Sequence, residues 1–327
     1  MRIHKLTSVD AFVVFDLDGA SNATGPVRAG DKILATSATE LARCTTYAYA
    51  SLGLQKSGAS AGINAQGPSR ADAIAKFVAE VEKLAVDGTF LPDPTKAVSA
   101  DDLASLRSHD PRAAVDDDLL IAQGAAAALD AFGVEMADGR AAIEGFGPSS
   151  LPLVDLLEQQ EARIVAVGTA AGTATNSAGF DPSELREVLA AHGDDCVAHL
   201  NDEPMPANRI FGVDADVLFV GSRLGVLNDR SAPFVRARTV VPTGPSPLTA
   251  KGFAILQAAN IMVVPDFVVM AAPLAVAWHA GDPAAAIAGI VHDVVDEDDI
   301  YLAACRRAED FLRTWRETLP FGRPLAG

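Results

Sequence analysis

The sequence of 327 residues contains few cysteines, few basic residues and no long apolar run, and each shortage excludes a class of protein. Its three cysteines, Cys44, Cys196 and Cys305, are odd in number and far apart, which predicts buried thiols in a reducing compartment rather than a disulfide framework or a zinc site. Lys and Arg number 26 against 43 Asp and Glu, for a formal net charge of −17. A field of this sign repels nucleic acid and anionic lipid, so we expect no nucleic-acid partner.

No stretch reaches the roughly 20 apolar residues that a membrane-spanning helix needs. The most apolar run, Phe267 to Ala280, is too short and is interrupted by proline. The segment from Met1 to Asp10 lacks the apolar run that follows the basic residues of a signal peptide. The sequence therefore predicts a cytoplasmic protein with no membrane partner.

The six histidines do not pair at the spacing of metal ligands on a helix. His109, which precedes Asp110, is the histidine that we single out for its neighbouring carboxylate. We predict no metal site.

The length and the apolar content of 49% suit two domains with a core each. The first unit contains the apolar run Ala11–Phe15, which predicts a buried strand. Helices are predicted to begin at Ser37, Ser69 and Ser99, because an acidic residue follows each serine three positions later, as in a capping box. Residues 112–135 are rich in Ala and Leu and predict a helical hinge after this unit.

From residue 141 onward, short apolar runs alternate with helical segments. The predicted strands are 141–144, 163–167, 217–220, 239–241 and 261–264. Asp181, followed by Pro182, predicts the start of one of the intervening helices. This alternation is typical of a parallel, doubly wound sheet, so we expect an α/β fold. Residues 283–318 predict amphipathic helices at the end of the chain.

A glycine-rich turn lies between the first of these strands and the helix after it, and reads Gly145, Phe146, Gly147, Pro148, Ser149 and Ser150. Dinucleotide sites use glycines here for a tight turn and for the close approach of pyrophosphate to a helix N-terminus. Ser150 stands where the third glycine is usual, and Pro148 lacks a backbone N–H. At the end of the next strand Thr169 stands where an acid usually holds the ribose. Two interpretations stay open, a dinucleotide site and a turn that no longer binds one.

Two short motifs point to other enzyme classes. Asp16 and Asp18 follow an apolar strand and precede Gly19, as in phosphatases that use one aspartate as nucleophile and Mg²⁺ to offset charge. We keep this reading as a minor alternative, because Ala20 departs from the motif and no later acidic pair completes it. Gly58 to Gly62 has the letters of a hydrolase nucleophile elbow, but a helix precedes it and a strand follows, so we reject that reading.

Several segments, in order along nearly the whole chain, match the motifs of one known family. They are Gly25-Pro26-Val27-Arg28 (the G-G-x-R turn), Thr45-Thr46-Tyr47-Ala48 (M-T-x-K), Ser57-Gly58-Ala59-Ser60-Ala61-Gly62-Ile63 (G-G-x-K-G-G-I), Leu91-Pro92-Asp93-Pro94-Thr95 with Ser99-Ala100-Asp101-Asp102 (P-A-P-D-x-x-T-s-x-x-D), Gly145-Phe146-Gly147 (G-F-G-N-V-G), and 240–256 with 263–266 (the strands of the cofactor cleft). The sequence thus resembles the Glu/Leu/Phe/Val (amino-acid) dehydrogenase family.

The resemblance implies a site whose side chains are mostly replaced in this chain. The family's lysine for the substrate carboxylate falls on Ala48, its water-activating lysine on Ser60 and its proton-transferring aspartate on Thr95. Two asparagines near the nicotinamide fall on Pro245 and Met270. Lys56 lies before the glycine loop rather than in it, so we do not expect it to substitute for a lost lysine.

The resemblance also implies the architecture and the partners. We expect a substrate and dimerisation domain at 1–120, a Rossmann-like domain at 121–275, and C-terminal helices at 276–327 that pack back toward the first domain. The cofactor implied is NAD or NADP, at Gly145, Phe146, Gly147, Ser149, Ser150 and Thr169. The partner implied is a second copy of the chain, with a hetero-oligomer containing an active paralogue as the alternative.

Three functions are compatible with these observations. The first is an NAD(P)-dependent oxidoreductase of the amino-acid class that has lost standard oxidative deamination. The second is a non-catalytic binding or regulatory subunit on the same fold. The third is the Mg²⁺-dependent phosphatase at Asp16 and Asp18.

Overall fold

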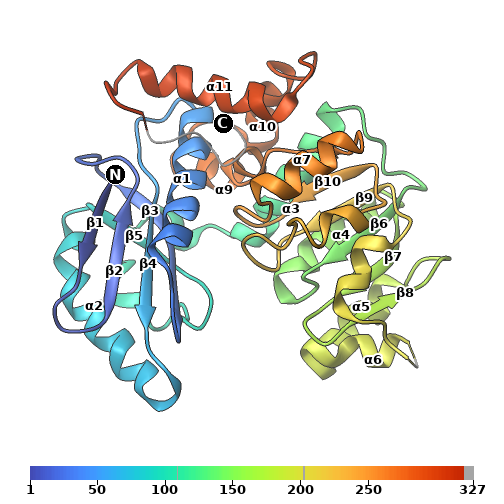
Figure 1. Ribbon diagram of the computed structural model, residues 1–327, viewed down its shortest axis with the longest axis horizontal. Coiled ribbons are helices and arrows are strands. Elements are labelled where there is room, and N and C mark those ends of the chain that lie inside the picture. The colour runs from blue at the N-terminus through green and yellow to red at the C-terminus, as the bar shows by residue number, and fades with distance from the viewer. Residues whose placement is uncertain (109, 202, 320–327) are drawn as a thin grey trace. The chain divides into compact units, whose positions relative to one another are not determined.

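A computed structural model describes residues 1–108, 110–201 and 203–319 of the protein (Figure 1). The chain forms two compact units. Unit 1 comprises Met1–Val115, Leu274–Ala280 and Cys305–Gly327, and unit 2 comprises Asp116–Pro273 and Gly281–Ala304. The domain boundaries that the sequence suggests, at residues 120 and 275, remain a proposal.

Unit 1 contains a mixed five-stranded sheet with the order β1-β2-β4-β3-β5. The strands are β1 (Arg2–Lys5), β2 (Ala11–Phe15), β3 (Ala23–Gly30), β4 (Ala59–Asn64) and β5 (Phe90–Pro94). The pairs β1/β2 and β2/β4 are antiparallel, whereas β3 runs parallel to both β4 and β5. The predicted strand Ala11–Phe15 is confirmed, and all five of its residues are buried. The resemblance predicts a turn at 25–28, and this is wrong because the segment lies inside β3 between two partner strands.

Helices α1 (Ala35–Ser51) and α2 (Arg70–Val86) accompany this sheet, together with short 3₁₀ turns at Gly67–Ser69, Ala104–Leu106 and Pro111–Ala114. The predicted start of α1 at Ser37 is wrong: the helix begins after Leu34, and the Ser37 hydroxyl donates back to the Leu34 carbonyl (2.8 Å). Ser69 precedes α2 as predicted, although its side chain caps no N–H. Phe77 and Val81 of α2 pack into the apolar core with Val13 and Phe90 of the sheet.

The third predicted helix of unit 1 is much shorter than the sequence suggests. Ser99 and Asp102 exchange hydrogen bonds, with the Asp102 carboxylate accepting from the Ser99 N–H (2.8 Å) and the Asp102 N–H donating to the Ser99 hydroxyl (3.2 Å). Only the 3₁₀ turn Ala104–Leu106 follows. The capping pair forms without a long helix behind it.

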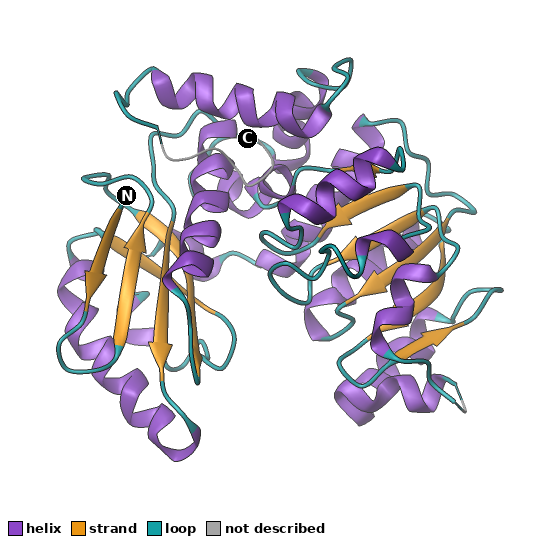
Figure 2. Cartoon of the chain, in the orientation of Figure 1, coloured by secondary structure: helices purple, strands orange, loops and turns teal. Residues whose placement is uncertain are grey.

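Unit 2 contains a six-stranded sheet with the order β11-β10-β9-β6-β7-β8. In Figure 2, helices drawn in purple lie over the orange strands of this sheet. The strands are β6 (Arg140–Glu144), β7 (Arg163–Gly168), β8 (Thr173–Thr175), β9 (Val217–Val220), β10 (Thr239–Pro242) and β11 (Met262–Val263). Every pair is parallel except β7/β8. This order, in which later strands lie on the far side of β6, confirms the predicted α/β, doubly wound arrangement.

Several helices accompany this sheet. They are α3 (Asp117–Ala131), α4 (Leu151–Gln159), α5 (Pro182–His192), α6 (Val197–Leu200), α7 (Ala250–Ala258), α8 (Asp266–Val269) and α10 (Pro283–His292), while α9 (Ala271–Ala277) and α11 (Ile300–Arg313) contain residues of both units. Short 3₁₀ turns occur at η4 (Pro148–Ser150), η5 (Gly193–Cys196), η6 (Ala207–Gly212) and η7 (Ala232–Phe234). The predicted start of α5 is confirmed, because the Asp181 carboxylate accepts from the Ser183 N–H (2.9 Å).

Three further expectations concern the whole chain. All three cysteines are free and buried, as predicted. No helix in the described part of the chain is both long and apolar enough to cross a membrane. Among the same residues, no three His, Cys, Asp or Glu side chains gather in a geometry that would hold a metal ion. His109 lies outside the described residues.

Candidate functional site

The glycine turn of unit 2 opens into a cavity of about 630 Å³ beside the carboxyl ends of β6 and β7. Its lining includes Glu144, Gly145, Phe146, Gly147, Gly168, Thr169, Ala170, Asp194, Ser222 and Arg223. Open parallel sheets bind ligands in this position, where the strand order reverses. The structure therefore brings four of the six predicted cofactor residues, Gly145, Phe146, Gly147 and Thr169, to one crevice, which we call the strand-end crevice. Ser149 and Ser150 line a smaller neighbouring cavity.

Gly145 is required by close packing against the loop after β9. Its φ is +83°, and a Cβ atom there would lie 2.7 Å from the Ser222 nitrogen. The Glu144 carboxylate holds the same loop by accepting from the N–H groups of Gly221 and Ser222 (both 3.2 Å). The turn is thus shaped by packing within unit 2 whether or not a ligand binds.

The donors of the turn are largely satisfied by the turn itself. The Gly147 N–H donates to the Ser150 hydroxyl (3.0 Å), and that hydroxyl donates in return to the Gly147 carbonyl (2.7 Å). Pro148 supplies no N–H. A pyrophosphate in the strand-end crevice would therefore compete with an internal hydrogen bond for the Gly147 N–H.

Thr169 is similarly engaged. Its hydroxyl donates to the Asp194 carbonyl (2.6 Å) and accepts from the Ala171 N–H (3.1 Å). Asp194, in η5, is an exposed acidic residue that lines the crevice beside Thr169. The sequence did not point to Asp194, because it lies 25 residues beyond Thr169 and no spacing rule links the two. Exposed Arg223 is a second crevice residue that the sequence analysis missed.

In unit 1, the positions to which the sequence resemblance assigns catalytic residues, Ala48, Ser60 and Thr95, hold no ionisable side chain. Ala48 is fully buried in α1. The Ser60 hydroxyl, in β4, donates to the Pro26 carbonyl (3.0 Å), and the Thr95 hydroxyl donates to the Val27 carbonyl (2.8 Å). The structure thus brings Ser60 and Thr95 to consecutive residues of β3, and both hydroxyls are bound to backbone.

Tyr49, the residue after Ala48, is the centre of a polar group that the sequence analysis missed. Its hydroxyl lies 2.8 Å from the Thr24 hydroxyl and accepts from the Trp278 indole N–H (3.1 Å). Burial raises the pKa of Tyr49 to about 12. Lys56 places its ammonium 3.3 Å from the centroid of the Trp278 ring, and partial burial lowers the pKa of Lys56.

Buried Arg112 anchors a second polar group in unit 1. Its guanidinium donates to both carboxylate oxygens of Asp93 (2.6 and 2.7 Å), to Asp110 and to the Leu91 carbonyl (2.9 Å). Paired arginine and carboxylates of this kind satisfy one another's charge when they leave water. Asp93 and Asp110 therefore hold the segment around β5 in place.

The two phosphatase candidates do not form an accessible pair. The Asp16 side chain is fully buried beside Arg43, 3.4 Å from its Nε atom, and burial raises the pKa of Asp16 although Arg43 opposes the rise. The Asp18 side chain is 61% exposed and pairs with Arg2 (3.3 Å). In the rejected hydrolase motif, Ser60 lies within β4 rather than on a turn, which confirms that rejection.

Comparison with known proteins places these features in a family. Residues 121–277 match the family described as Glutamate/Leucine/Phenylalanine/Valine dehydrogenase. This segment of the chain belongs to that family. An NADP-specific glutamate dehydrogenase of Saccharolobus shibatae is 28% identical over 127 residues, which are 39% of this chain and 30% of that protein. The cryptic catabolic NAD-specific glutamate dehydrogenase GudB of Bacillus subtilis is 24% identical over 146 residues, 45% of this chain and 34% of that protein.

These matches span about a third of the length of the curated relatives. Solved structures are similar to this chain in fold over nearly its whole length. A hetero-hexameric glutamate dehydrogenase of Thermus thermophilus, in its leucine-bound form, has a TM-score of 0.73 at 20% identity and covers 94% of this chain and 86% of its own. An L-tryptophan dehydrogenase of Nostoc punctiforme has a TM-score of 0.63 at 18% identity and covers 96% and 95%.

Proposed function

We propose that this dehydrogenase-family protein has lost standard NAD(P)-dependent oxidative deamination of amino acids and acts as a non-catalytic, regulatory subunit in the cytoplasm. The observation that carries the proposal is the state of Ser60 and Thr95. They stand at positions that the family resemblance assigns to a catalytic lysine and an aspartate, and their hydroxyls donate to the Pro26 and Val27 carbonyls.

The size of the expected loss in reaction rate supports this proposal. A serine or threonine hydroxyl that is tied to a backbone carbonyl neither activates water nor carries a proton at neutral pH. Losing one general acid or base costs about 10²–10⁴ in rate, and here two such groups and the carboxylate-binding lysine are replaced together. Apolar Ala48, which is fully buried, supplies nothing in place of that lysine.

The proposed partner is a chain of the same family, either a second copy or an active paralogue. The glutamate dehydrogenase of Thermus thermophilus that shares this fold is described as hetero-hexameric. A subunit that keeps the fold but does not catalyse the reaction is compatible with such an assembly.

A second candidate is an NAD(P)-dependent oxidoreductase with a different substrate, and the strand-end crevice favours it. About 630 Å³ beside the ends of β6 and β7 is large enough for much of a dinucleotide, and Arg223 supplies a cation for its phosphates. A bound nicotinamide would accept or supply a hydride. Because the Gly147 N–H and the Thr169 hydroxyl are already engaged, we expect the crevice to hold NAD or NADP weakly.

The test of the proposal is an assay of the purified protein with glutamate, leucine, phenylalanine and valine, each with NAD and with NADP. We expect no reduction of either cofactor with any of the four. Calorimetric titration with NADH and NADPH separates the two candidates. Saturable micromolar binding would favour the redirected oxidoreductase, and absence of binding at millimolar cofactor would favour the non-catalytic subunit.

A further inference from the structure

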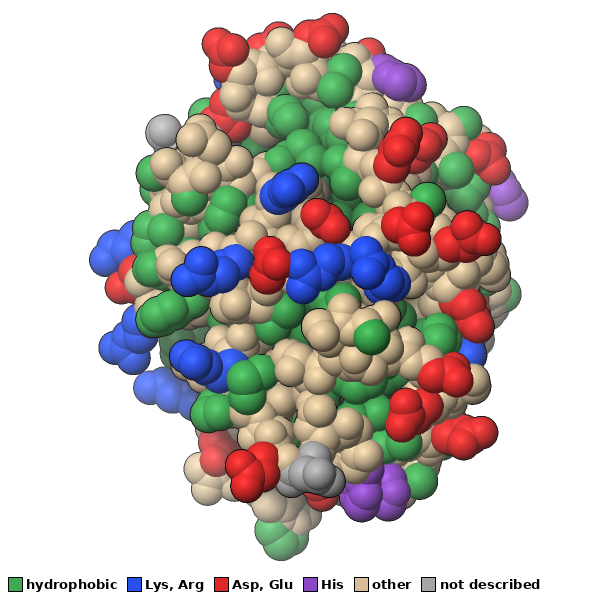
Figure 3. All heavy atoms as spheres, turned by 90° about the vertical axis from the view of Figure 1, so that its right-hand side faces the viewer, with side chains coloured by type: hydrophobic (Ala, Val, Ile, Leu, Met, Phe, Trp, Pro, Cys, Tyr) green, Lys and Arg blue, Asp and Glu red, His purple; other side chains and the backbone are tan. Residues whose placement is uncertain are grey.

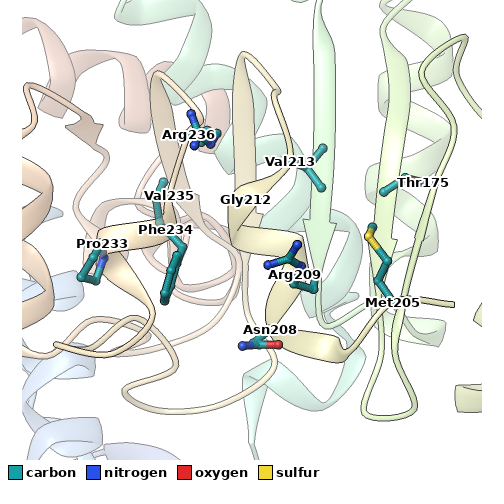
Figure 4. Close-up of a pocket in the computed structure, with 10 residues that line it drawn as sticks. All are labelled: Thr175, Met205, Asn208, Arg209, Gly212, Val213, Pro233, Phe234, Val235 and Arg236. Atoms are coloured by element: carbon teal, nitrogen blue, oxygen red, sulfur yellow. The ribbon is translucent and has the colours of Figure 1, made fainter.

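Unit 2 contains a second cavity, of about 640 Å³, in the region of η6 and η7 (Figure 4). Its lining is Thr175, Met205, Asn208, Arg209, Gly212, Val213, Pro233, Phe234, Val235 and Arg236. We call it the η6–η7 cavity. It shares only Asn208 with the strand-end crevice, so a ligand in one leaves most of the other free.

The walls of this cavity are fixed by backbone hydrogen bonds. Met205 pairs with Thr173 of β8 through two bonds of 2.8 and 2.9 Å, and the Arg236 N–H donates to the Phe211 carbonyl (3.1 Å). Ile210 and Phe211 are buried and anchor η6 to the core of unit 2. The cavity is therefore a preformed hollow, with its two sides tied together, rather than a gap between mobile loops.

Two arginines give the cavity a positive lining. Arg209 comes from η6 and Arg236 follows η7, and both side chains are exposed. In the described part of the chain, neither guanidinium has a carboxylate partner within 4.0 Å, although the protein carries 43 acidic residues. Figure 3 shows Lys and Arg side chains in a row across one face of the protein, with acidic side chains among and around them. Two unpaired guanidiniums in one hollow favour a ligand with more than one negative charge.

The remaining lining is apolar and includes an aromatic ring. Phe234 is 57% exposed, unusually open for a large apolar side chain. In Figure 4, Pro233, Phe234 and Val235 lie on one side and Met205 and Thr175 on the other, with Arg209 and Asn208 between them. An exposed aromatic face beside arginines suits a planar ring that carries phosphate.

We propose that the η6–η7 cavity binds a phosphorylated small molecule with a planar ring, of the size of a nucleoside mono- or diphosphate. The phosphate lies between Arg209 and Arg236, the ring packs on Phe234, and Asn208 and Thr175 offer hydrogen bonds. The volume is within the usual range of about 300–1,000 Å³ for small-molecule sites. The site is separate from the proposed dinucleotide crevice, and it gives a regulatory subunit a place to sense a metabolite.

The test is calorimetric titration of the full chain with ADP, adenosine and inorganic pyrophosphate. We expect saturable binding of ADP, and weaker binding of adenosine, which lacks the phosphates, and of pyrophosphate, which lacks the ring. Arg209→Gln and Arg236→Gln should each weaken ADP binding at least about tenfold, the loss expected for one charge-assisted contact, and Phe234→Ala should weaken ADP but not pyrophosphate.

Arg230→Gln is the matched control, because Arg230 is an exposed arginine of the same unit that does not line the cavity. The affinity of the Arg230→Gln variant for ADP should equal that of the unaltered protein. All four substitutions are at exposed side chains, and an unchanged thermal melt verifies the fold. The proposal is overturned if ADP does not bind, or if it binds equally well when Arg209 and Arg236 are both replaced, which would assign it to the strand-end crevice.

Discussion

The Ser150 hydroxyl occupies the Gly147 N–H that a phosphate in the strand-end crevice would otherwise meet. Ser150→Gly removes that competitor and restores a glycine at this point of the turn. We expect NADH to bind about tenfold more tightly to this variant, because a hydrogen bond to a charged group contributes about 1.5–3 kcal/mol. Calorimetric titration measures the change. Ser149→Gly is the control, and an equal gain there would mean that flexibility, not the freed N–H, improves binding.

Asp194 is expected to set the choice between the two nicotinamide cofactors. Asp194 lines the crevice beside Thr169, where the ribose of a dinucleotide lies in folds of this kind, so we expect its carboxylate to be near a bound ribose. A 2′-phosphate would be repelled, so NADH should bind more tightly than NADPH. Asp194→Asn should lower the ratio of the NADPH dissociation constant to the NADH dissociation constant by about tenfold. This corresponds to the removal of roughly 1.4 kcal/mol of repulsion. A ratio that is unchanged in this variant contradicts the assignment.

Tyr49 makes the stability of unit 1 depend on pH in the alkaline range. Its pKa is raised by burial from 10.0 to about 12, so the unfolded chain loses this proton before the folded protein does. The stabilisation is complete below pH 10 and is lost as pH rises toward 12, amounting to about 2–3 kcal/mol. Urea unfolding at pH 9 and pH 11 should show a larger loss for the unaltered protein than for Tyr49→Phe. Equal losses would mean that Tyr49 does not titrate differently on folding.

Some site residues could be predicted from the sequence because they act within their own turn of the chain. Gly145 was predicted from a strand-turn-helix pattern, and its positive φ agrees with the need for glycine. Asp194 and the pairing of Arg112 with Asp93 were not found, because each contact joins residues that are distant in the chain. Arg112 meets Asp93 across a sequence separation of 19. Ordinary spacing rules do not encode such contacts.

At the scale of elements, replacing each of two glycines by alanine should change the free energy of unfolding in opposite directions. A Cβ atom on Gly58 would lie 1.7 Å from the Ala42 carbonyl oxygen, so Gly58→Ala must push α1 away from the start of β4. We expect a loss of about 3 kcal/mol in the free energy of unfolding. Gly289 is exposed within α10, and a Cβ atom added there would meet no atom within 4 Å, so Gly289→Ala should stabilise the protein by about 1 kcal/mol. Urea denaturation of both variants measures the contrast, and the same sign for both would contradict it.

Element boundaries were predicted well where one residue determines them and poorly where the sheet does. Asp181 begins α5 through its own carboxylate, and the sequence predicted that start. β3 contains Gly25 and Pro26, which favour a turn, yet it is a strand because β4 and β5 pair with it on both sides. Here tertiary pairing overrides local preference, and the first unit's mixed sheet could not be derived from the sequence alone.

At the scale of the whole molecule, the chain shares its fold with solved amino-acid dehydrogenases, and the loss of their charged site residues is our proposal. The structural likeness covers 94% to 96% of the chain at identities of 20% or less, so packing patterns persisted where side chains changed. The sequence predicted the α/β class and the parallel sheet, because apolar strands alternate with helices along unit 2. The proposed loss of activity is compatible with a retained fold, because chemistry resides in a few side chains.

A rate assay at high protein concentration tests whether the protein has lost amino-acid dehydrogenase activity. Purified protein with a verified thermal melt is incubated with glutamate, leucine, phenylalanine or valine and with NAD or NADP, and reduced cofactor is followed by its absorbance. A glutamate dehydrogenase measured in parallel is the positive control. We expect a rate lower than that of the control by a factor of at least about 10⁴ for every pair of amino acid and cofactor, given the combined loss of the acid–base groups. Clear turnover of any one of the four amino acids at a rate near that of the control would contradict it.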